Sequence, residues 1–101
     1  MGGRMLIFMQ LKTQLYIDGK WVNGASTLAV TDPSDNSVIA NVQVSSDKEC
    51  ADAVDAAARA FKSWSKTAPR VRGEVLRKAF DIMVAEADRL AEIVSKENGK
   101  V

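Results

Sequence analysis

The stretch that decides the fold runs from Ser46 to Lys100 and reads SDKECADAVDAAARAFKSWSKTAPRVRGEVLRKAFDIMVAEADRLAEIVSKENGK. Its apolar residues recur every three or four positions, which predicts two amphipathic helices. The pattern is broken once, at Ala68-Pro69, and stops at Asn98-Gly99. Proline suits the first turn of a helix and glycine suits the position after its end, so these residues bound the second helix.

The first helix is predicted to begin at Ser46, because Ser46 and Glu49 have the S-x-x-E spacing of a capping box. Its apolar face consists of Cys50, Ala53, Val54, Ala57, Ala60, Phe61 and Trp64. Cys50 lies at the edge of this face, and the sequence contains no histidine that could act as its base. We therefore interpret Cys50 as a half-buried structural thiol.

The second helix is predicted from Pro69 to Glu97. At a rise of ~1.5 Å per residue it would be about 43 Å long, whereas a compact domain of this size is roughly 34 Å across. Its apolar stripe consists of Val75, Leu76, Ala79, Ile82, Met83, Ala87, Leu90, Ile93 and Val94. Since the helix is longer than the body it should cover, we expect a C-terminal remainder or a homo-oligomer to cover the stripe.

The residues before these helices predict short antiparallel strands. In LYIDGKWV (15–22), Asp18-Gly19 is a two-residue type I′ loop, which places Tyr16 opposite Trp21 and Leu15 opposite Val22. Two further strands, 28–31 and 38–44, flank a cluster of turn-forming residues. The second of them alternates, so its buried face is expected to consist of Val38, Ala40, Val42 and Val44, with Ile39, Asn41 and Gln43 on the other face.

Composition limits the function. The net charge is +1, and the basic stretch Arg70, Arg72, Arg77 and Lys78, with Lys62 and Lys66 upstream, has no aromatic residue between positions 70 and 78. We interpret these residues as a solvated face, or as partners of carboxylates elsewhere in a larger protein, and expect no nucleic-acid partner. No apolar run is long enough to span a membrane. A single cysteine cannot form an internal disulfide, which favours a reducing, cytoplasmic location. Without histidine, the commonest general base and metal ligand is missing.

The N-terminal residues 1–14 are predicted to form a flexible extension, and residues 15–101 a single structural unit. The apolar run Met5–Met9 is shorter than the core of a signal peptide, and no typical cleavage site follows it. We therefore expect no targeting role for this segment.

An ordered series of segments from Leu15 to Lys100 resembles the N-terminal portion of the aldehyde dehydrogenase superfamily. The segments are LYIDGKWV, VTDPSDNSVIANV, AVDAAARAFKSW, RGEVLRKAFDIM and LAEIVSKENGK. RGEVLRKAFDIM is most similar to succinate-semialdehyde dehydrogenases. The resemblance implies an α/β fold, in which a hairpin, a strand–turn–strand and two long helices open a Rossmann-type cofactor-binding domain. Because the family continues for several hundred residues, we expect the chain to be a fragment.

The resemblance implies oxidation of an aldehyde, with succinate semialdehyde as the suggested substrate, to a carboxylic acid with NAD or NADP as cofactor. In the family a cysteine thiolate attacks the aldehyde, hydride passes to the nicotinamide and a glutamate activates water. No residue of this chain matches those groups, and Cys50 matches neither the place nor the context of the nucleophile. We therefore expect no catalytic or cofactor-binding residue here and no activity of the chain alone.

The resemblance also implies one metal site, since some members hold a monovalent cation near the strand–turn. The matching positions are the carbonyl groups of Val30 and Thr31 and the carboxylate of Glu97, which stands where some relatives have the shorter Asp. The alternative to the dehydrogenase interpretation is a small helical-hairpin module that binds a partner through its apolar stripe without catalysis.

Overall fold

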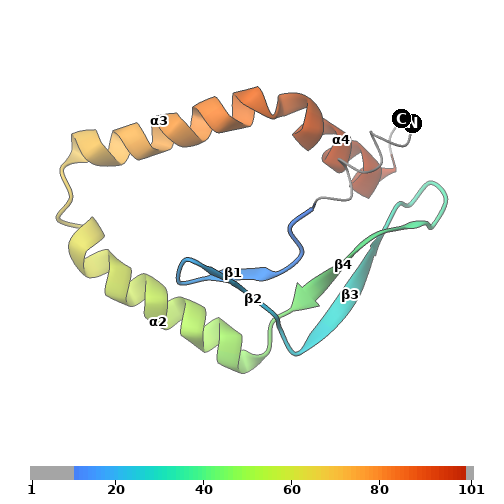
Figure 1. Cartoon of the computed structure of the whole chain (residues 1–101), viewed down its shortest axis with the longest axis horizontal. Helices are drawn as coiled ribbons and strands as arrows, with labels where there is room; N and C mark the ends of the chain where they lie inside the picture. The colour runs from blue at the N-terminus through green and yellow to red at the C-terminus, as the bar shows by residue number, and fades with distance from the viewer. Residues whose placement is uncertain (1–10, 100–101) are drawn as a thin grey trace.

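The computed structural model describes residues 11–99, which form two small sheets followed by helices (Figure 1). The strands are β1 (Leu15–Ile17), β2 (Lys20–Val22), β3 (Ser26–Thr31) and β4 (Val38–Val44). The helices are α2 (Asp47–Trp64), α3 (Pro69–Ala85) and α4 (Ala87–Asn98). The sheets are two-stranded and antiparallel, β1 with β2 and β3 with β4. This order agrees with the predicted fold class.

The β1–β2 hairpin has the predicted register, with Leu15 opposite Val22 and Tyr16 opposite Trp21. Asp18 and Gly19 both have positive φ, 53° and 74°, as a type I′ loop requires. The rings of Tyr16 and Trp21 meet edge to face with their centroids 4.9 Å apart. This part of the prediction is confirmed.

The β3–β4 sheet differs from its predicted pattern at one point. Val30 pairs with Ala40 and Thr31 pairs with Val38, so Ile39 is an extra residue on β4 at a bulge. Ile39 is buried, whereas Val38 at the start of the predicted buried face is 57% exposed. The predicted face was therefore wrong at this end, because a bulge interrupts the strict alternation on which it depended.

The helix boundaries agree with the predicted start and stop signals, but the second predicted helix is two helices. Pro69 begins α3, and Gly99 ends α4 in the left-handed conformation. Glu86 separates the two helices with φ −106° and ψ 19°. Backbone hydrogen bonds still join Glu86 N to Ile82 O and Leu90 N to Glu86 O, each at 3.0 Å. No proline or glycine marks this bend, so the sequence pattern did not reveal it.

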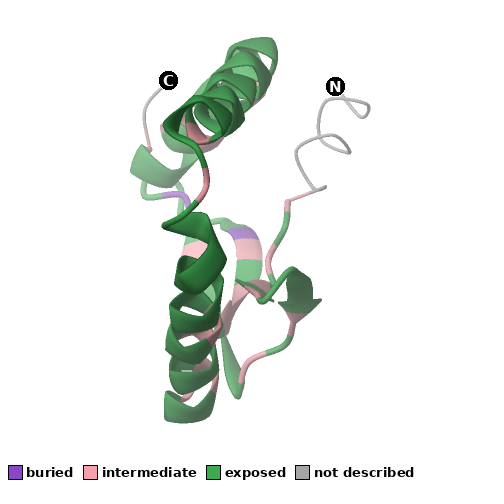
Figure 2. Cartoon of the chain, turned by 90° about the vertical axis from the view of Figure 1, so that its left-hand side faces the viewer, coloured by how far each residue is buried: buried purple, intermediate pink, exposed green. Residues whose placement is uncertain are grey.

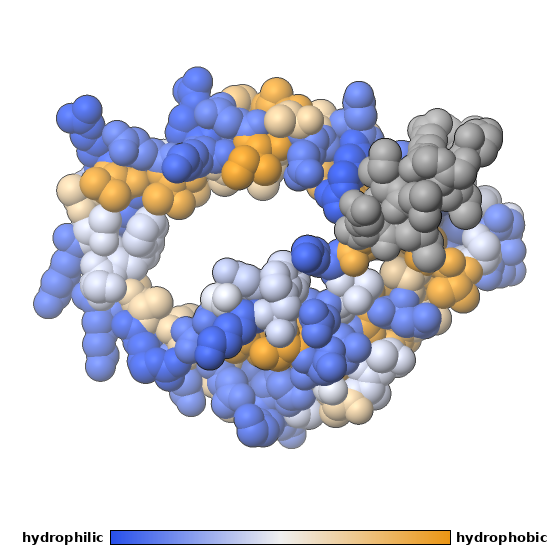
Figure 3. Space-filling model, in the orientation of Figure 1, coloured by the Kyte–Doolittle hydropathy of each residue, from blue (hydrophilic) through white to orange (hydrophobic). Residues whose placement is uncertain are grey.

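The three helices and the two sheets surround an opening rather than a shared core (Figures 1 and 3). The radius of gyration is 17.0 Å, compared with about 13 Å for a compact domain of this length. Among residues 11–99, Ile39 is the only buried apolar residue, and Figure 2 shows most of the helical surface as exposed. The part of the chain that the structure describes therefore leaves most of its apolar side chains in water.

Residues 11–14, the end of the predicted N-terminal extension, run beside β4. The carbonyl oxygen of Thr13 accepts a hydrogen bond from the N–H of Gln43 at 2.9 Å, and Gln14 Nε2 donates to Asn23 Oδ1 at 2.8 Å. The remainder of the extension and the apolar run Met5–Met9 lie outside the described residues. The division of the chain at residue 14 stays a prediction. Between residues 11 and 99, no helix has the length and apolarity needed to cross a membrane.

Candidate functional site

The turn between β3 and β4 contains a network of side-chain and backbone hydrogen bonds. Asp32 is buried, and its Oδ1 accepts hydrogen bonds from the N–H of Ser34 at 2.9 Å and from its hydroxyl at 2.7 Å. The Asp32 carbonyl oxygen also accepts from the N–H of Asn36 at 2.7 Å. A buried polar group without partners would destabilise the fold. The hydrogen bonds from Ser34 give the buried Asp32 carboxylate its partners within the turn itself.

A second aspartate continues this turn. Asp35 Oδ1 accepts hydrogen bonds from the N–H of Ser37 at 2.9 Å and from its hydroxyl at 2.7 Å. The side-chain and then the backbone hydrogen bonds from Ser37 lower the pKa of Asp35, with a smaller contribution from the charge of Lys96 on α4. The hydrogen bonds from Ser37 therefore favour the ionised form of the Asp35 carboxyl group.

The end of α4 lies directly against this turn. A Cβ atom added to Gly99 would be 3.1 Å from the backbone nitrogen of Ser34 and 3.3 Å from Cβ of Pro33. Gly99 also has φ 68°, a conformation that costs other L-residues energy. Both the backbone conformation and the close approach therefore favour glycine at this position, where the end of α4 contacts the β3–β4 turn. The sequence interpretation had assigned Gly99 only to the end of the helix.

The three predicted cation ligands belong to the elements that meet at this contact. Val30 and Thr31 are the last two residues of β3, immediately before the turn, and Glu97 is exposed in the last turn of α4. Carbonyl and carboxylate oxygens are the donors that hard cations prefer, so this donor set suits an alkali-metal ion. Among residues 11–99, no cluster of three or more His, Cys, Asp or Glu side chains could hold a metal ion. Ligation by Val30, Thr31 and Glu97 stays a prediction.

Cys50 is exposed, which corrects the prediction of a half-buried thiol. Its sulfur lies 3.1 Å from Ser45 Oγ, and this hydroxyl also donates to the Ser46 carbonyl oxygen at 2.9 Å. A serine hydroxyl is not a base that can deprotonate a thiol at neutral pH. The geometry around Cys50 therefore offers no activated nucleophile.

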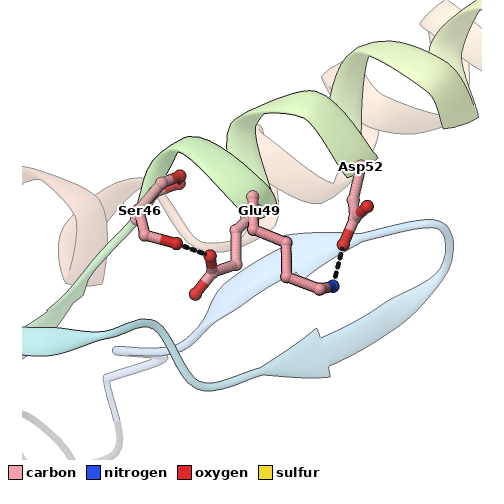
Figure 4. Close-up of polar contacts among 5 residues, drawn as sticks. Ser46, Glu49 and Asp52 are labelled. Atoms are coloured by element: carbon pink, nitrogen blue, oxygen red, sulfur yellow. Dashed lines mark hydrogen bonds and ion pairs between the residues drawn. The ribbon is translucent and has the colours of Figure 1, made fainter.

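The first turn of α2 carries charges that stabilise a helix start (Figure 4). The hydroxyl of Ser46 donates to the carboxylate of Glu49, and Lys48 Nζ lies 2.8 Å from Asp52 Oδ2. The hydrogen bond from Ser46 is the main cause that lowers the pKa of Glu49. The hydrogen bond to Asp52 and its charge raise the pKa of Lys48. Ser46 and Glu49 pair as the capping box predicted, but the Ser46 hydroxyl bonds to the Glu49 side chain instead of capping a backbone N–H.

One pocket of about 350 Å³ lies beside β4. It is lined by Leu11, Thr13, Val38, Ile39, Ala40 and Asn41. None of these side chains titrates or is a strong nucleophile, so the pocket has no group that could carry out acid–base or covalent chemistry.

The short antiparallel strands followed by helices define the class first: an α/β arrangement whose apolar side chains are largely exposed. The sequence profile of the Aldehyde dehydrogenase family matches residues 21–101. The chain belongs to this family, as the resemblance predicted.

Two relatives illustrate the match. The chain is 40% identical over 86 residues to succinate-semialdehyde dehydrogenase (NADP(+)) of Saccharomyces cerevisiae. The aligned region covers 84% of this chain and 17% of the yeast protein. It is 44% identical over 87 residues to malonate-semialdehyde dehydrogenase 2 of Bacillus cereus. Here the aligned region covers 84% of this chain and 18% of the Bacillus protein. The chain thus spans less than a fifth of the length of these two proteins.

Two solved structures share the fold. Betaine aldehyde dehydrogenase from Staphylococcus aureus, in complex with NAD+, superposes on this chain with a TM-score of 0.87 at 29% sequence identity. The match covers 94% of this chain and 20% of the Staphylococcus chain. An aldehyde dehydrogenase from Brucella melitensis superposes with a TM-score of 0.82 at 38% sequence identity. That match covers 85% of this chain and 18% of the Brucella chain. The predicted start of an aldehyde dehydrogenase fold is confirmed.

Proposed function

We propose that this chain supplies the N-terminal scaffold of an NAD(P)-dependent aldehyde dehydrogenase, which oxidises an aldehyde to a carboxylic acid. The observation that carries the proposal is the superposition on the NAD+-bound betaine aldehyde dehydrogenase, with a TM-score of 0.87. The chain corresponds to 20% of that protein, so the groups that act on the aldehyde come from the remaining part of the fold.

The proposed substrate class is a short aldehyde that also carries a carboxylate. Relatives of similar identity are named for succinate semialdehyde and for malonate semialdehyde. Both compounds have an aldehyde at one end and a carboxylate at the other. We favour succinate semialdehyde, because RGEVLRKAFDIM (72–83) is most similar to that group of enzymes.

The proposed role of the chain is structural. Its hairpin, strand–turn–strand and three helices form the outer elements on which a cofactor-binding sheet is assembled. On α3, three large apolar residues are exposed to solvent: Val75 by 51%, Leu76 by 71% and Met83 by 61%. Large exposed apolar patches mark contact surfaces, so these side chains fit a scaffold that the rest of the enzyme covers. We place the protein in the cytoplasm because its single thiol suits a reducing compartment.

The test uses the chain alone and in a chimera. The purified chain, supplied with succinate or malonate semialdehyde and either NAD+ or NADP+, is expected to give no rise in NAD(P)H absorbance. A chimera in which this chain replaces the matching segment of the yeast relative is expected to regain activity that the same relative loses when the segment is deleted. Turnover by the chain alone, or a folded chimera that stays inactive, would contradict the proposal.

The helical-hairpin module remains the competing candidate. The apolar stripe is exposed in the described chain, and a separate binding partner could cover it as well as the rest of an enzyme could. Hydrogen exchange on the isolated chain separates the two proposals. Slow exchange throughout α3 and α4 in a monodisperse monomer favours an independent module. Fast exchange there, slowed only in the chimera, favours the scaffold.

A further inference from the structure

The pocket beside β4 borders Ile39, the only buried apolar residue of the described chain. The other residues that line it are apolar or neutral polar, namely Leu11, Val38, Ala40, Thr13 and Asn41. Val38 is 57% exposed at this wall, although it belongs to a strand. The pocket therefore suits an apolar occupant, whose burial would extend the core that begins at Ile39.

The edge of β4 that faces away from β3 also has backbone groups to satisfy. Gln43 donates its N–H to the carbonyl oxygen of Thr13, which lines the pocket, at 2.9 Å. Because alternate residues of a strand direct their backbone groups to the same side, the N–H and C=O of Asn41 lie at this edge too. Between residues 11 and 99, the Gln43–Thr13 bond is the only backbone hydrogen bond across it. A peptide segment brings apolar side chains together with backbone donors and acceptors, so it meets both needs.

Residues 11–14 lead from this pocket into β1 and are held in place by several contacts (Figure 1). Besides the backbone bond to β4, Gln14 Nε2 donates to Asn23 Oδ1 at 2.8 Å. Lys12 Nζ lies 5.5 Å from the centroid of a Trp21 ring. A cation over an exposed aromatic ring is a weak contact by itself. Together these contacts determine from where the preceding residues of the chain begin.

Those preceding residues include the apolar run Met5–Met9, which reads MLIFM. Met9 is two residues from Leu11, so its Cα lies within about 7 Å of the Cα of a residue that lines the pocket. A tether this short gives the run a high effective concentration at the pocket. A separate molecule would in addition lose its translational and rotational freedom on binding. Chain continuity therefore favours the run over other apolar occupants.

We propose that the apolar run Met5–Met9 of this same chain covers the pocket beside β4 and shields the free edge of that strand. Burial of its side chains against Leu11, Val38 and Ile39 is the driving force. Shielding the edge also keeps it from pairing with a strand of another molecule. This inference concerns the chain itself and does not depend on the proposed enzymatic function.

The first test measures how well the pocket wall is covered. In a Cys50→Ser background, Val38→Cys places a thiol on that wall. The matched control is Leu28→Cys on β3, at a residue that is 60% exposed and does not line the pocket. Each thiol reacts with a maleimide in the full chain, in a chain that begins at Met5 and in one that begins at Met9.

The chain that begins at Met5 keeps the whole run, whereas the one that begins at Met9 loses most of it. The thiol introduced at position 38 is expected to react at least about tenfold faster in the chain that begins at Met9, because its cover is gone. The chain that begins at Met5 is expected to behave like the full chain, and the thiol introduced at position 28 is expected to react equally in all three.

Two outcomes of this test would overturn the proposal. Equal rates at position 38 in all three chains would favour a flexible extension instead. A thiol at position 38 that is protected only in the chimera with the yeast relative would identify the rest of the enzyme as the occupant. Both outcomes are independent of whether the chimera is active.

The second test locates the run directly by NMR, in the full chain with isotope-labelled methionine methyl groups. Nuclear Overhauser effects are expected between the methyl group of Met9 and the methyl groups of Val38 or Ile39. Met9→Leu identifies the signal by removing it, and Met83 on α3 is the control, for which no such effect is expected. If neither Met5 nor Met9 shows an effect to β4, the run does not cover the pocket.

Discussion

Arg59 Nη2 on α2 lies 3.3 Å from Asp18 Oδ2 in the β1–β2 turn, and this ion pair joins two segments 41 residues apart. The two side chains are 61% and 67% exposed. Water and salt therefore screen their attraction, and an exposed pair of this kind contributes less than about 1 kcal/mol. The pair therefore marks where the hairpin lies on α2 but adds little to the stability of the fold.

Replacing Arg59 tests that conclusion. Arg59→Ala is expected to raise hydrogen exchange at Gly19 and Lys20 by less than about threefold, because the hairpin keeps its own turn and the Tyr16–Trp21 contact. Arg59→Lys serves as the control that keeps the charge. A tenfold or larger increase would mean that the ion pair is a principal support of the hairpin.

Two glycines with positive φ allow a matched comparison. Gly19 and Gly99 have φ 74° and 68°, but an added Cβ meets nothing within 4 Å at Gly19 and lies 3.1 Å from Ser34 N at Gly99. Gly19→Ala is expected to destabilise its turn by about 1–2 kcal/mol from the backbone alone. Gly99→Ala is expected to cost more and to raise exchange at the Ser34 amide, because the turn must move away from α4.

Native-state hydrogen exchange of the two variants measures this difference. If Gly99→Ala affects only the last turn of α4 and leaves the Ser34 amide unchanged, the contact between α4 and the β3–β4 turn is not maintained in solution.

The Ser46–Glu49 hydrogen bond predicts a pH dependence at the start of α2. Because the folded pKa of Glu49 is lowered, its stabilising contribution is present above the ordinary glutamate pKa and is lost as the pH falls through the folded value. We expect the first turn of α2 to fray only as the pH falls below the ordinary glutamate pKa of about 4.3. Ser46→Ala is expected to move the pKa of Glu49 back toward its ordinary value.

A carbon-detected NMR titration of the Glu49 carboxyl group measures this shift. Ser45→Ala is the control, since the Ser45 hydroxyl bonds to the Ser46 carbonyl and lies beside Cys50, not Glu49. An equal shift in both variants would show that Ser46 does not act through its own hydrogen bond.

The proposed cation site makes a crystallographic prediction. Crystals of the chain or of the chimera, soaked in rubidium or thallium(I), are expected to show an anomalous peak between the carbonyl groups of Val30 and Thr31 and the carboxylate of Glu97. Glu97→Gln is expected to reduce the peak, whereas Asp88→Asn at the other end of α4 is expected to leave it unchanged. Crystals that show no peak there would refute the site.

The local structure followed closely from the sequence. Asp18-Gly19 determined the hairpin loop and its register, Pro69 determined where α3 begins, and Gly99 determined where α4 ends. These features depend on the φ preferences and hydrogen-bonding capacity of a few neighbouring residues, which are the same in any tertiary context. The ordered motifs that extend from 15 to 100 were also sufficient to indicate the family.

Only the tertiary structure decided the rest. The bend at Glu86, the bulge at Ile39, the exposure of Cys50 and the contact of Gly99 with Ser34 each depend on how distant segments meet. Apolar periodicity shows that a helix face needs a partner but not which surface supplies it, because burial is a property of the whole assembly. The sequence by itself therefore determined most of the elements and their ends, whereas the structure decided which faces remain open.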